Sequence, residues 1–247
     1  MKTTTSIKTT ARTAGFLYLL QIPLGVFGIV YVPQALIVIG DPGKTVSNIL
    51  ANEFIFRLSI VSAILCALVT IATAVYIYRV LKSINKQQAR WIVIFTIIVA
   101  PITILNELNN VAVLLLLKYP EYSPAFTPGQ VNNLVSIFLD IHHYGLQLAG
   151  IFFGLWLFPM GYLVLRSTYI PKIIGILLMV TCLGYLLDFL IFFLLPGFNV
   201  IISEYTWLGE VLMVLWLLIK GVNAKRFEKW QEDQKLVLPG NPFPDPA

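Results

Sequence analysis

Ionisable side chains inside long apolar stretches are the residues of this sequence that could do chemistry. The candidates are Glu107 with Asn106 and Asn110, Asp140 with His142, His143 and Tyr144, and the single carboxylates Asp188 and Glu210. Because an ionised group is costly in hydrocarbon, each is a functional-site hypothesis. Carboxylates in a partly dry pocket can exchange protons, and a carboxylate together with imidazole can bind a metal ion. Glu53 and Arg57, four residues apart beside the second apolar stretch, are secondary candidates that we expect to form an ion pair.

Three kinds of function remain open for these side chains. Proton-coupled movement of a solute would use Glu107, Asp188 and Glu210. A zinc-dependent hydrolase would need His143 or His142 to meet at least two carboxylates and leave a position open for water, and no H-E-x-x-H or comparable spacing supports it. In the third alternative the polar groups hydrogen-bond across helices and fix the structure, or the protein binds a partner. Catalytic residues and metal ligands therefore stay unassigned.

Composition requires a membrane around these residues. The chain has 247 residues, of which 58% are hydrophobic and 12% charged, and its mean hydropathy is +0.83. A water-soluble fold is excluded, since no soluble core buries so much apolar surface. The apolar runs are about twenty residues long and lack strict alternation, which favours spanning helices over a barrel. We predict an all-α polytopic transmembrane helix bundle.

The apolar residues form six runs. They extend from Gly15 to Ile39, Arg57 to Leu81, Trp91 to Leu117, Leu134 to Leu165, Ile173 to Leu195 and Tyr205 to Lys220. Pro23 and Pro33 predict a kink in the first run, and the fourth run is longer than one crossing needs. Residues 1–222 are therefore expected to form one six-helix domain. Residues 223–247 are expected to form a short basic helix and then a proline-rich tail that is disordered at its end.

The distribution of Lys and Arg predicts the orientation in the membrane. Fourteen of the seventeen lie in the two terminal segments and the second and fourth connections; the others are Lys44, Arg57 and Lys118. Basic residues accumulate on the cytoplasmic side, so we predict a multi-pass cell-membrane protein with both termini cytoplasmic. The net charge of +5 then indicates contact with anionic lipid headgroups and not with nucleic acid. Cys66 and Cys182 lie inside apolar runs and are expected to be unpaired.

Depth and helical phase predict how the candidates are arranged. With this topology the carboxylates lie nearer the non-cytoplasmic ends of their spans. They should therefore line one shared, outward-facing polar pocket that binds or passes a small solute or a lipid headgroup. At 3.6 residues per turn, His143 and Tyr144 share a face with Asp140, whereas His142 points nearly the opposite way. We expect Asp140 to pair with His143 or Tyr144, and His142 to lie outside the cluster.

Several segments of the chain resemble a known family. They are Ala11-Arg12-x-Ala14-Gly15-x-Leu17-Tyr18-Leu19, Phe56-Arg57-Leu58, Leu139-Asp140-x-His142-x-Tyr144-Gly145, Phe152-Phe153-Gly154-Leu155, Arg166-Ser167-x-Tyr169-Ile170-Pro171-Lys172, Gly184-Tyr185-Leu186-x-Asp188 and Leu215-Trp216-Leu217-Leu218-x-Lys220-Gly221. These segments look like the uncharacterised bacterial membrane family named domain of unknown function 4386. The resemblance covers the chain from Ala11 to about Val222. It implies a bacterial cytoplasmic-membrane protein with about six helices, and it supplies no activity.

The same resemblance bears on cofactors. The family pattern places one histidine where His142 stands and a second where this chain has Trp156. Fourteen residues bring these two positions to one helical face, so relatives could hold a metal ion or haem between paired histidines. In this chain the pair is broken, and we predict no cofactor.

Overall fold

The chain folds into a bundle of α-helices. The computed structural model describes residues 2–118, 126–195, 197–198 and 200–237, and within these ranges it contains helices and no strand. The helices are α1 (Lys2–Gly25), the π-helix η1 (Val26–Tyr31), α2 (Val32–Leu36), α3 (Pro42–Ala51), α4 (Glu53–Leu81), α5 (Lys86–Asn106), α6 (Leu108–Lys118), α7 (Pro128–Leu155), α8 (Leu157–Arg166), α9 (Lys172–Leu194), α10 (Ser203–Thr206), α11 (Leu208–Leu215), the π-helix η3 (Trp216–Lys220) and α12 (Ala224–Val237). The expected fold class is confirmed.

Five stretches in the described part of the chain are long and apolar enough to cross a membrane. They are Ile7–Leu36, Glu53–Leu81, Lys86–Lys118, Pro128–Arg166 and Lys172–Leu194. They correspond to the first five apolar runs and extend beyond them at several ends. The sixth run is divided among α10, α11 and η3, with an interruption at Trp207. The chain is therefore a multi-pass integral membrane protein with a short sixth segment. The expected proline-rich tail falls on residues 238–247, outside the described residues.

Local sequence signals set the helix starts. Asp41 caps α3 by accepting a hydrogen bond from the Lys44 N–H at 2.8 Å, and Asn85 caps α5 in the same way with the Gln88 N–H at 2.9 Å. Thr127 and Gln130 form a capping box at the start of α7. Each cap satisfies N–H groups that the first helical turn leaves without partners.

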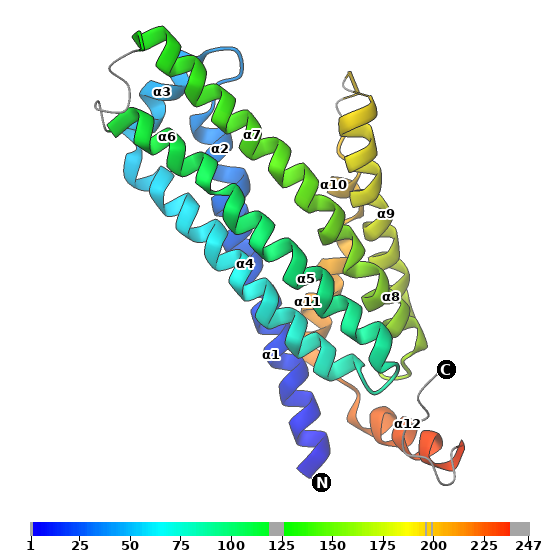
Figure 1. Ribbon diagram of the computed structural model, residues 1–247. Helices are drawn as coiled ribbons and strands as arrows, with labels where there is room; N and C mark the ends of the chain where they lie inside the picture. The colour runs from blue at the N-terminus through cyan, green and yellow to red at the C-terminus, as the bar shows by residue number, and fades with distance from the viewer. Residues whose placement is uncertain (1, 119–125, 196, 199, 238–247) are drawn as a thin grey trace.

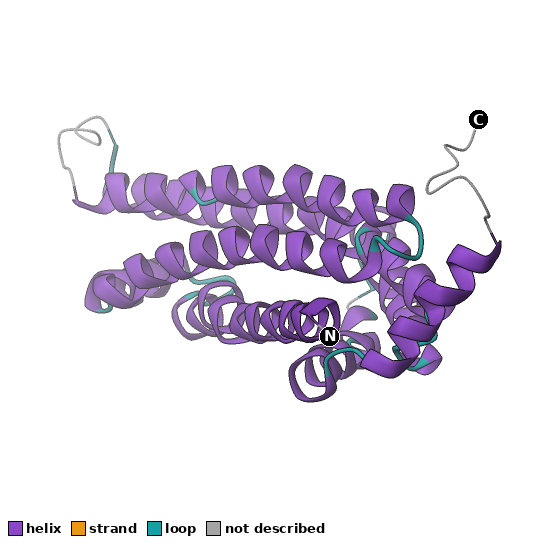
Figure 2. Ribbon diagram, turned by 90° about the horizontal axis from the view of Figure 1, so that it is seen from below, coloured by secondary structure: helices purple, strands orange, loops and turns teal. Residues whose placement is uncertain are grey.

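The helices form a tilted group and a second, more upright group (Figure 1). In the first, α4 packs against α1 and α5, while α7 packs against α5 and α6. In the second, α9 packs against α7, α8 and α11. Figure 2 shows that mostly short loops join the helices. The start of α1, the turn between α4 and α5, the connection between α8 and α9, and α12 all lie at one end (Figure 1), which we call the basic end. The opposite end, with α3 and the start of α7, is the far end.

Two hydrophobic clusters build the core, and polar residues lie between them along the helices. The cluster nearer the far end includes Phe56 and Ile60 of α4, and the cluster nearer the basic end includes Ala74 and Ile77 of the same helix. Polar residues of the intervening segments include Gln21, Thr70, Thr73, Asn106, Glu107 and His142. Hydrogen bonds join several of them across helices. For example, the Gln21 amide donates to Thr73 Oγ1 at 2.7 Å and accepts from Thr70 Oγ1 at 2.8 Å.

The first and third spans are interrupted in different ways. In the first, where Pro23 and Pro33 predicted a kink, the helix widens into the π-helix η1. Gly28 of η1 lies so close to α4 that an added Cβ would be 2.8 Å from the Ser59 carbonyl oxygen. In the third span, α5 ends and α6 begins on either side of Glu107.

Candidate functional site

A buried carboxylate stands at the break between α5 and α6. Glu107 is 3% exposed, and its backbone N–H bonds to the Ile104 carbonyl three residues back at 3.2 Å. Pro101, six residues earlier in α5, has no N–H to donate to the carbonyl of Ile97. The Glu107 side chain is thus buried at a point where the helix is interrupted.

Glu107 is paired with a histidine of α7. Its Oε1 lies 3.0 Å from His142 Nε2, and both side chains are buried. The other carboxylate oxygen, Oε2, accepts a hydrogen bond from Asn110 Nδ2 at 2.8 Å. A carboxylate can accept a hydrogen bond from the Nε2–H group, and a protonated carboxyl can donate one to the bare Nε2 atom. The Glu107–His142 contact can therefore persist while the proton resides on either partner.

Asn106 ties the same pair of helices together through the backbone. Its Nδ2 donates to the His142 carbonyl oxygen at 2.8 Å, and its own side-chain oxygen accepts from Asn109 Nδ2 at 3.1 Å. This contact needs a residue without a side chain on α7, because a Cβ at Gly145 would overlap the Asn106 side chain. We call Asn106, Glu107, Asn110 and His142 the histidine centre.

A second carboxylate lies among aromatic side chains. Glu210 of α11 accepts hydrogen bonds from Tyr18 Oη of α1 at 2.6 Å and from Tyr185 Oη of α9 at 3.4 Å. Trp156, which separates α7 from α8, packs edge-on against Tyr18 with ring centroids 5.5 Å apart. We call Tyr18, Trp156, Tyr185 and Glu210 the tyrosine centre. It joins four parts of the bundle that are distant in sequence.

The carboxylates do not all converge as expected, because Glu107 and Glu210 bind different partners at different distances from the basic end. Glu107 follows Lys86 by 21 residues, a rise of about 32 Å from the basic end, whereas Glu210 precedes Lys220 by ten residues, a rise of only about 15 Å. Asp188 accepts hydrogen bonds from the backbone N–H groups of Ile202 and Ser203 at 2.5 and 2.9 Å. It therefore caps the start of α10 from the neighbouring helix α9.

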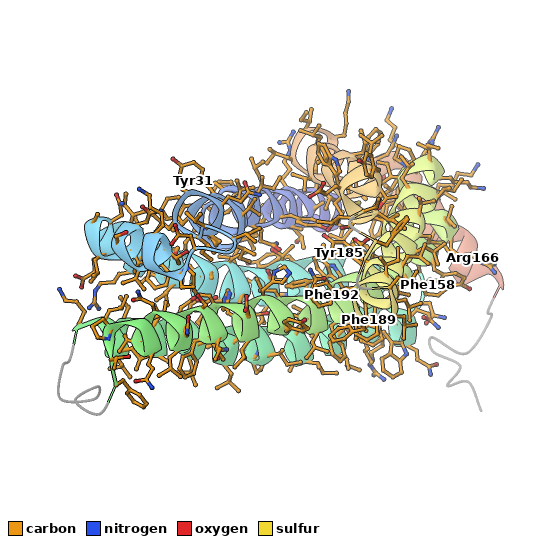
Figure 3. All side chains as sticks on the ribbon, turned by 90° about the horizontal axis from the view of Figure 1, so that it is seen from above. Tyr31, Phe158, Arg166, Tyr185, Phe189 and Phe192 are labelled. Carbon is orange, nitrogen blue, oxygen red and sulfur yellow. The ribbon has the colours of Figure 1, made fainter. Side chains whose placement is uncertain are left out.

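The expected placement of His142 on α7 is wrong. His142, which we placed outside the cluster, is buried against Glu107. Asp140, His143 and Tyr144 are exposed, and Asp140 interacts electrostatically with His143. His143 and Tyr144 also pack edge-on against Phe192 of α9, with ring centroids 5.4 and 4.9 Å apart. Phe192 lies on the side of α9 that faces α7 (Figure 3).

Helical phase itself was predicted correctly for α7, but the inward face was chosen wrongly. His142 and the triad of Asp140, His143 and Tyr144 do lie on different faces. Small residues mark the packed face of a membrane helix. Gly145 and Ala149, which share the face of His142, were the signal that could have identified it.

Two other expectations are confirmed. Arg57 Nε lies 2.8 Å from Glu53 Oε1, and Lys118 Nζ, which we did not anticipate, lies 2.7 Å from the other oxygen. Cys66 and Cys182 are free thiols.

Sequence reasoning missed Tyr18 and Tyr185 as partners of a carboxylate. A phenol at membrane depth needs a hydrogen-bond partner, and Tyr185 lies thirteen residues into its span, so this position carried a usable signal. The zinc hypothesis required a histidine to meet two carboxylates. Among the residues that the structure describes, no group of three His, Cys, Asp or Glu side chains could hold a metal ion.

Comparisons with known proteins place the chain in a family. The family model described as "Domain of unknown function (DUF4386)" matches residues 13–221. An uncharacterised protein of Archaeoglobus fulgidus is 32% identical over 181 residues, which cover 70% of this chain and 93% of that relative. No solved structure matches the chain. The matched segment contains both centres, and the chain belongs to the DUF4386 family.

Proposed function

We propose that this membrane protein couples proton exchange at Glu107 and His142 to the passage of a small polar solute. The observation that carries the proposal is the 3.0 Å contact between Glu107 Oε1 and His142 Nε2 inside a membrane-spanning bundle. Two titratable groups in hydrogen-bond contact can pass a proton between them, and ionisable residues inside a membrane bundle are typical of proton relays.

The position of the pair supports coupling to movement. Glu107 stands where one span divides into α5 and α6, and His142 belongs to the helix packed against both. Loading or unloading a proton changes the charge of a contact that joins α7 to a helix break. Interrupted helices in transporters commonly border the sites for substrates and coupling ions.

A structural role is the second candidate. It is favoured by the separate pairing of Glu107, Asp188 and Glu210, each of which has its own hydrogen-bond partners. In that case the polar groups fix helices against one another and exchange no protons during function.

Nitrogen-15 NMR of histidine-labelled protein in a bilayer tests the proton site directly. The chain has two histidines, and His143→Gln assigns their signals. We expect Glu107→Gln to change the ring-nitrogen signals of His142 at a fixed pH and to leave those of His143 unchanged, since His143 contacts aromatic rings and not Glu107. Unaltered His142 ring-nitrogen signals in Glu107→Gln would contradict proton sharing.

Proteoliposomes that contain a pH-sensitive dye test the coupling. A mixture of amino acids, sugars and amines is added outside, and the internal pH is followed. The wild type should show a solute-dependent pH change that Glu107→Gln and His142→Asn abolish, while the exposed variant Asp140→Asn retains it. If the wild type shows no such change and both variants only lose stability, the structural candidate holds.

We further propose that the basic end faces the cytoplasm, so that both termini are cytoplasmic, and that anionic lipid headgroups contact it. The support is the excess of Lys and Arg in the segments at that end. Single cysteines introduced at Lys44 and Lys86 in a cysteine-free background test the sidedness. A membrane-impermeant thiol reagent applied to intact cells should label Lys44→Cys alone; labelling of Lys86→Cys instead would reverse the topology.

A further inference from the structure

We propose that the tyrosine centre binds a monovalent organic cation, an ammonium group, through the carboxylate of Glu210 and the aromatic rings of Tyr18, Trp156 and Tyr185. The site is separate from the histidine centre and does not rest on the function proposed for it. The proposal stands on the charge, the surrounding rings and the accessibility of Glu210.

Glu210 has no cation of its own among the described residues. The groups that face it are phenols: Tyr18 from α1 and Tyr185 from α9. Asp188, one turn beyond Tyr185 on α9, is also acidic and binds backbone N–H groups. Arg12, a basic residue of α1 nearer the basic end, donates from Nη2 to the Ile219 carbonyl oxygen at 3.3 Å. A carboxylate at this depth without a countercharge is costly, so a bound cation or a proton must neutralise it.

The walls of the centre have the chemistry that holds an organic cation. Tyr18 is 5% and Trp156 is 3% exposed, and their rings meet edge-on. The face of an aromatic ring attracts a cation electrostatically, most strongly in a desolvated setting, and tryptophan provides the best such face. Ammonium groups suit this combination of rings and carboxylate better than small, strongly hydrated metal cations, which prefer several oxygen ligands.

The centre retains some accessibility. Glu210 and Tyr185 are half-buried, whereas Tyr18 is buried. Tyr185 lies on the inner side of α9 and is directed towards the other helices (Figure 3). Glu210 lies about 15 Å from the level of Lys220, near the middle of a bilayer core about 30 Å thick. A cation bound there would occupy the middle of the membrane.

Isothermal titration of the purified full chain in detergent tests the proposal with a matched pair of probes. Choline carries a quaternary ammonium group, and 3,3-dimethylbutan-1-ol is its neutral counterpart of the same shape. The wild type should bind choline and not the alcohol. Lowering the pH should weaken choline binding, because a proton on Glu210 competes with the cation.

Variants locate the binding to this centre. Glu210→Gln should weaken choline binding at least tenfold, and Trp156→Phe should weaken it several-fold. Glu210→Asp, which keeps the charge, should lose less than Glu210→Gln and guards against simple misfolding, as does a size-exclusion profile for each variant. Asp140→Asn, at an exposed residue of α7, is the control and should bind choline like the wild type. No choline binding by the wild type, equal binding of the alcohol, or unchanged binding by folded Glu210→Gln would overturn the proposal.

Discussion

The histidine centre and the tyrosine centre each bury a glutamate between helices, but they supply it with different partners. Glu107 meets an imidazole that can take its proton and the Asn110 amide, which donates a hydrogen bond to it. Glu210 meets two phenols, which remain neutral under ordinary conditions. In the first centre, Glu107 and His142 can therefore share one proton and remain neutral as a pair. In the second centre, Glu210 has no basic partner among the described residues and needs an added proton or a bound cation to become neutral. The same residue type thus acquires different chemistry from its neighbours.

Removal of each carboxylate in turn is the strongest test of the difference between the two centres. Glu107→Leu should destabilise the protein by about 3 kcal/mol, because His142 and Asn110 would remain buried without their partner. Glu210→Leu should cost only about 1 kcal/mol, since two hydroxyl groups lose an acceptor. Reversible denaturation in mixed micelles measures both values. A larger loss for Glu210→Leu would reverse the assigned difference.

A glycine substitution tests whether the histidine centre depends on close packing. Gly145→Ala should destabilise the protein by about 1–3 kcal/mol, because the new methyl group overlaps Asn106 and displaces it from the His142 carbonyl. Gly150→Ala on the same helix is the matched control, since nothing lies within 4 Å of its added Cβ. That change should stabilise α7 by up to about 1 kcal/mol. Equal losses for both variants would show that α7 tolerates no alanine for general reasons.

Removal of single hydroxyl groups tests the two hydrogen bonds of the tyrosine centre. Tyr18→Phe should cost about 1 kcal/mol because it removes a 2.6 Å bond to Glu210. Tyr185→Phe removes a bond of 3.4 Å and should cost about half as much or less. Tyr31→Phe, at a residue 61% exposed, serves as the control. Thermal unfolding of the three variants in one detergent gives the order, and a larger effect for Tyr185→Phe would contradict the geometry.

The smallest effect is expected on the exposed face of α7. Asp140→Asn and His143→Gln should each change the free energy of unfolding by about 0.5 kcal/mol or less, because both side chains are exposed. Parallel denaturation curves with unchanged midpoints are the expected result. A loss comparable to that of Glu107→Leu would mean that Asp140 and His143 have a partner that the isolated chain lacks.

The spans and the surface ion pair could be predicted from sequence, because each depends on local pattern. Twenty apolar residues specify a spanning helix without reference to any neighbour, and Glu53 and Arg57 are one helical turn apart. The ends of the spans were less certain, since polar residues such as Glu53 and Lys86 can continue a helix beyond the apolar run.

The arrangement of the two centres was harder to predict, because it depends on which helix faces pack and on how long each segment is. The choice between His142 and His143 required knowledge of which face of α7 packs, and the small residues Gly145 and Ala149 carried it more reliably than the charges did. The depth of Glu210 in the membrane depends on the length of the sixth segment, which the sequence pattern did not reveal. The prediction of one shared pocket placed all the carboxylates at a similar depth, whereas the spans that carry them differ in length.

The short sixth segment has a consequence for the surrounding lipid. Residues 203–220 rise about 27 Å in total, less than the hydrocarbon thickness of about 30 Å in a typical bilayer, and α10 begins at a cap supplied by Asp188. The neighbouring span Lys172–Leu194 is longer. Acyl chains beside α10 and α11 must therefore shorten or tilt to avoid exposing apolar surface to water, a response called hydrophobic mismatch. Lipids with short chains should accordingly gather along this side of the protein. The thickness of the membrane should influence how stably the sixth segment packs against the other helices.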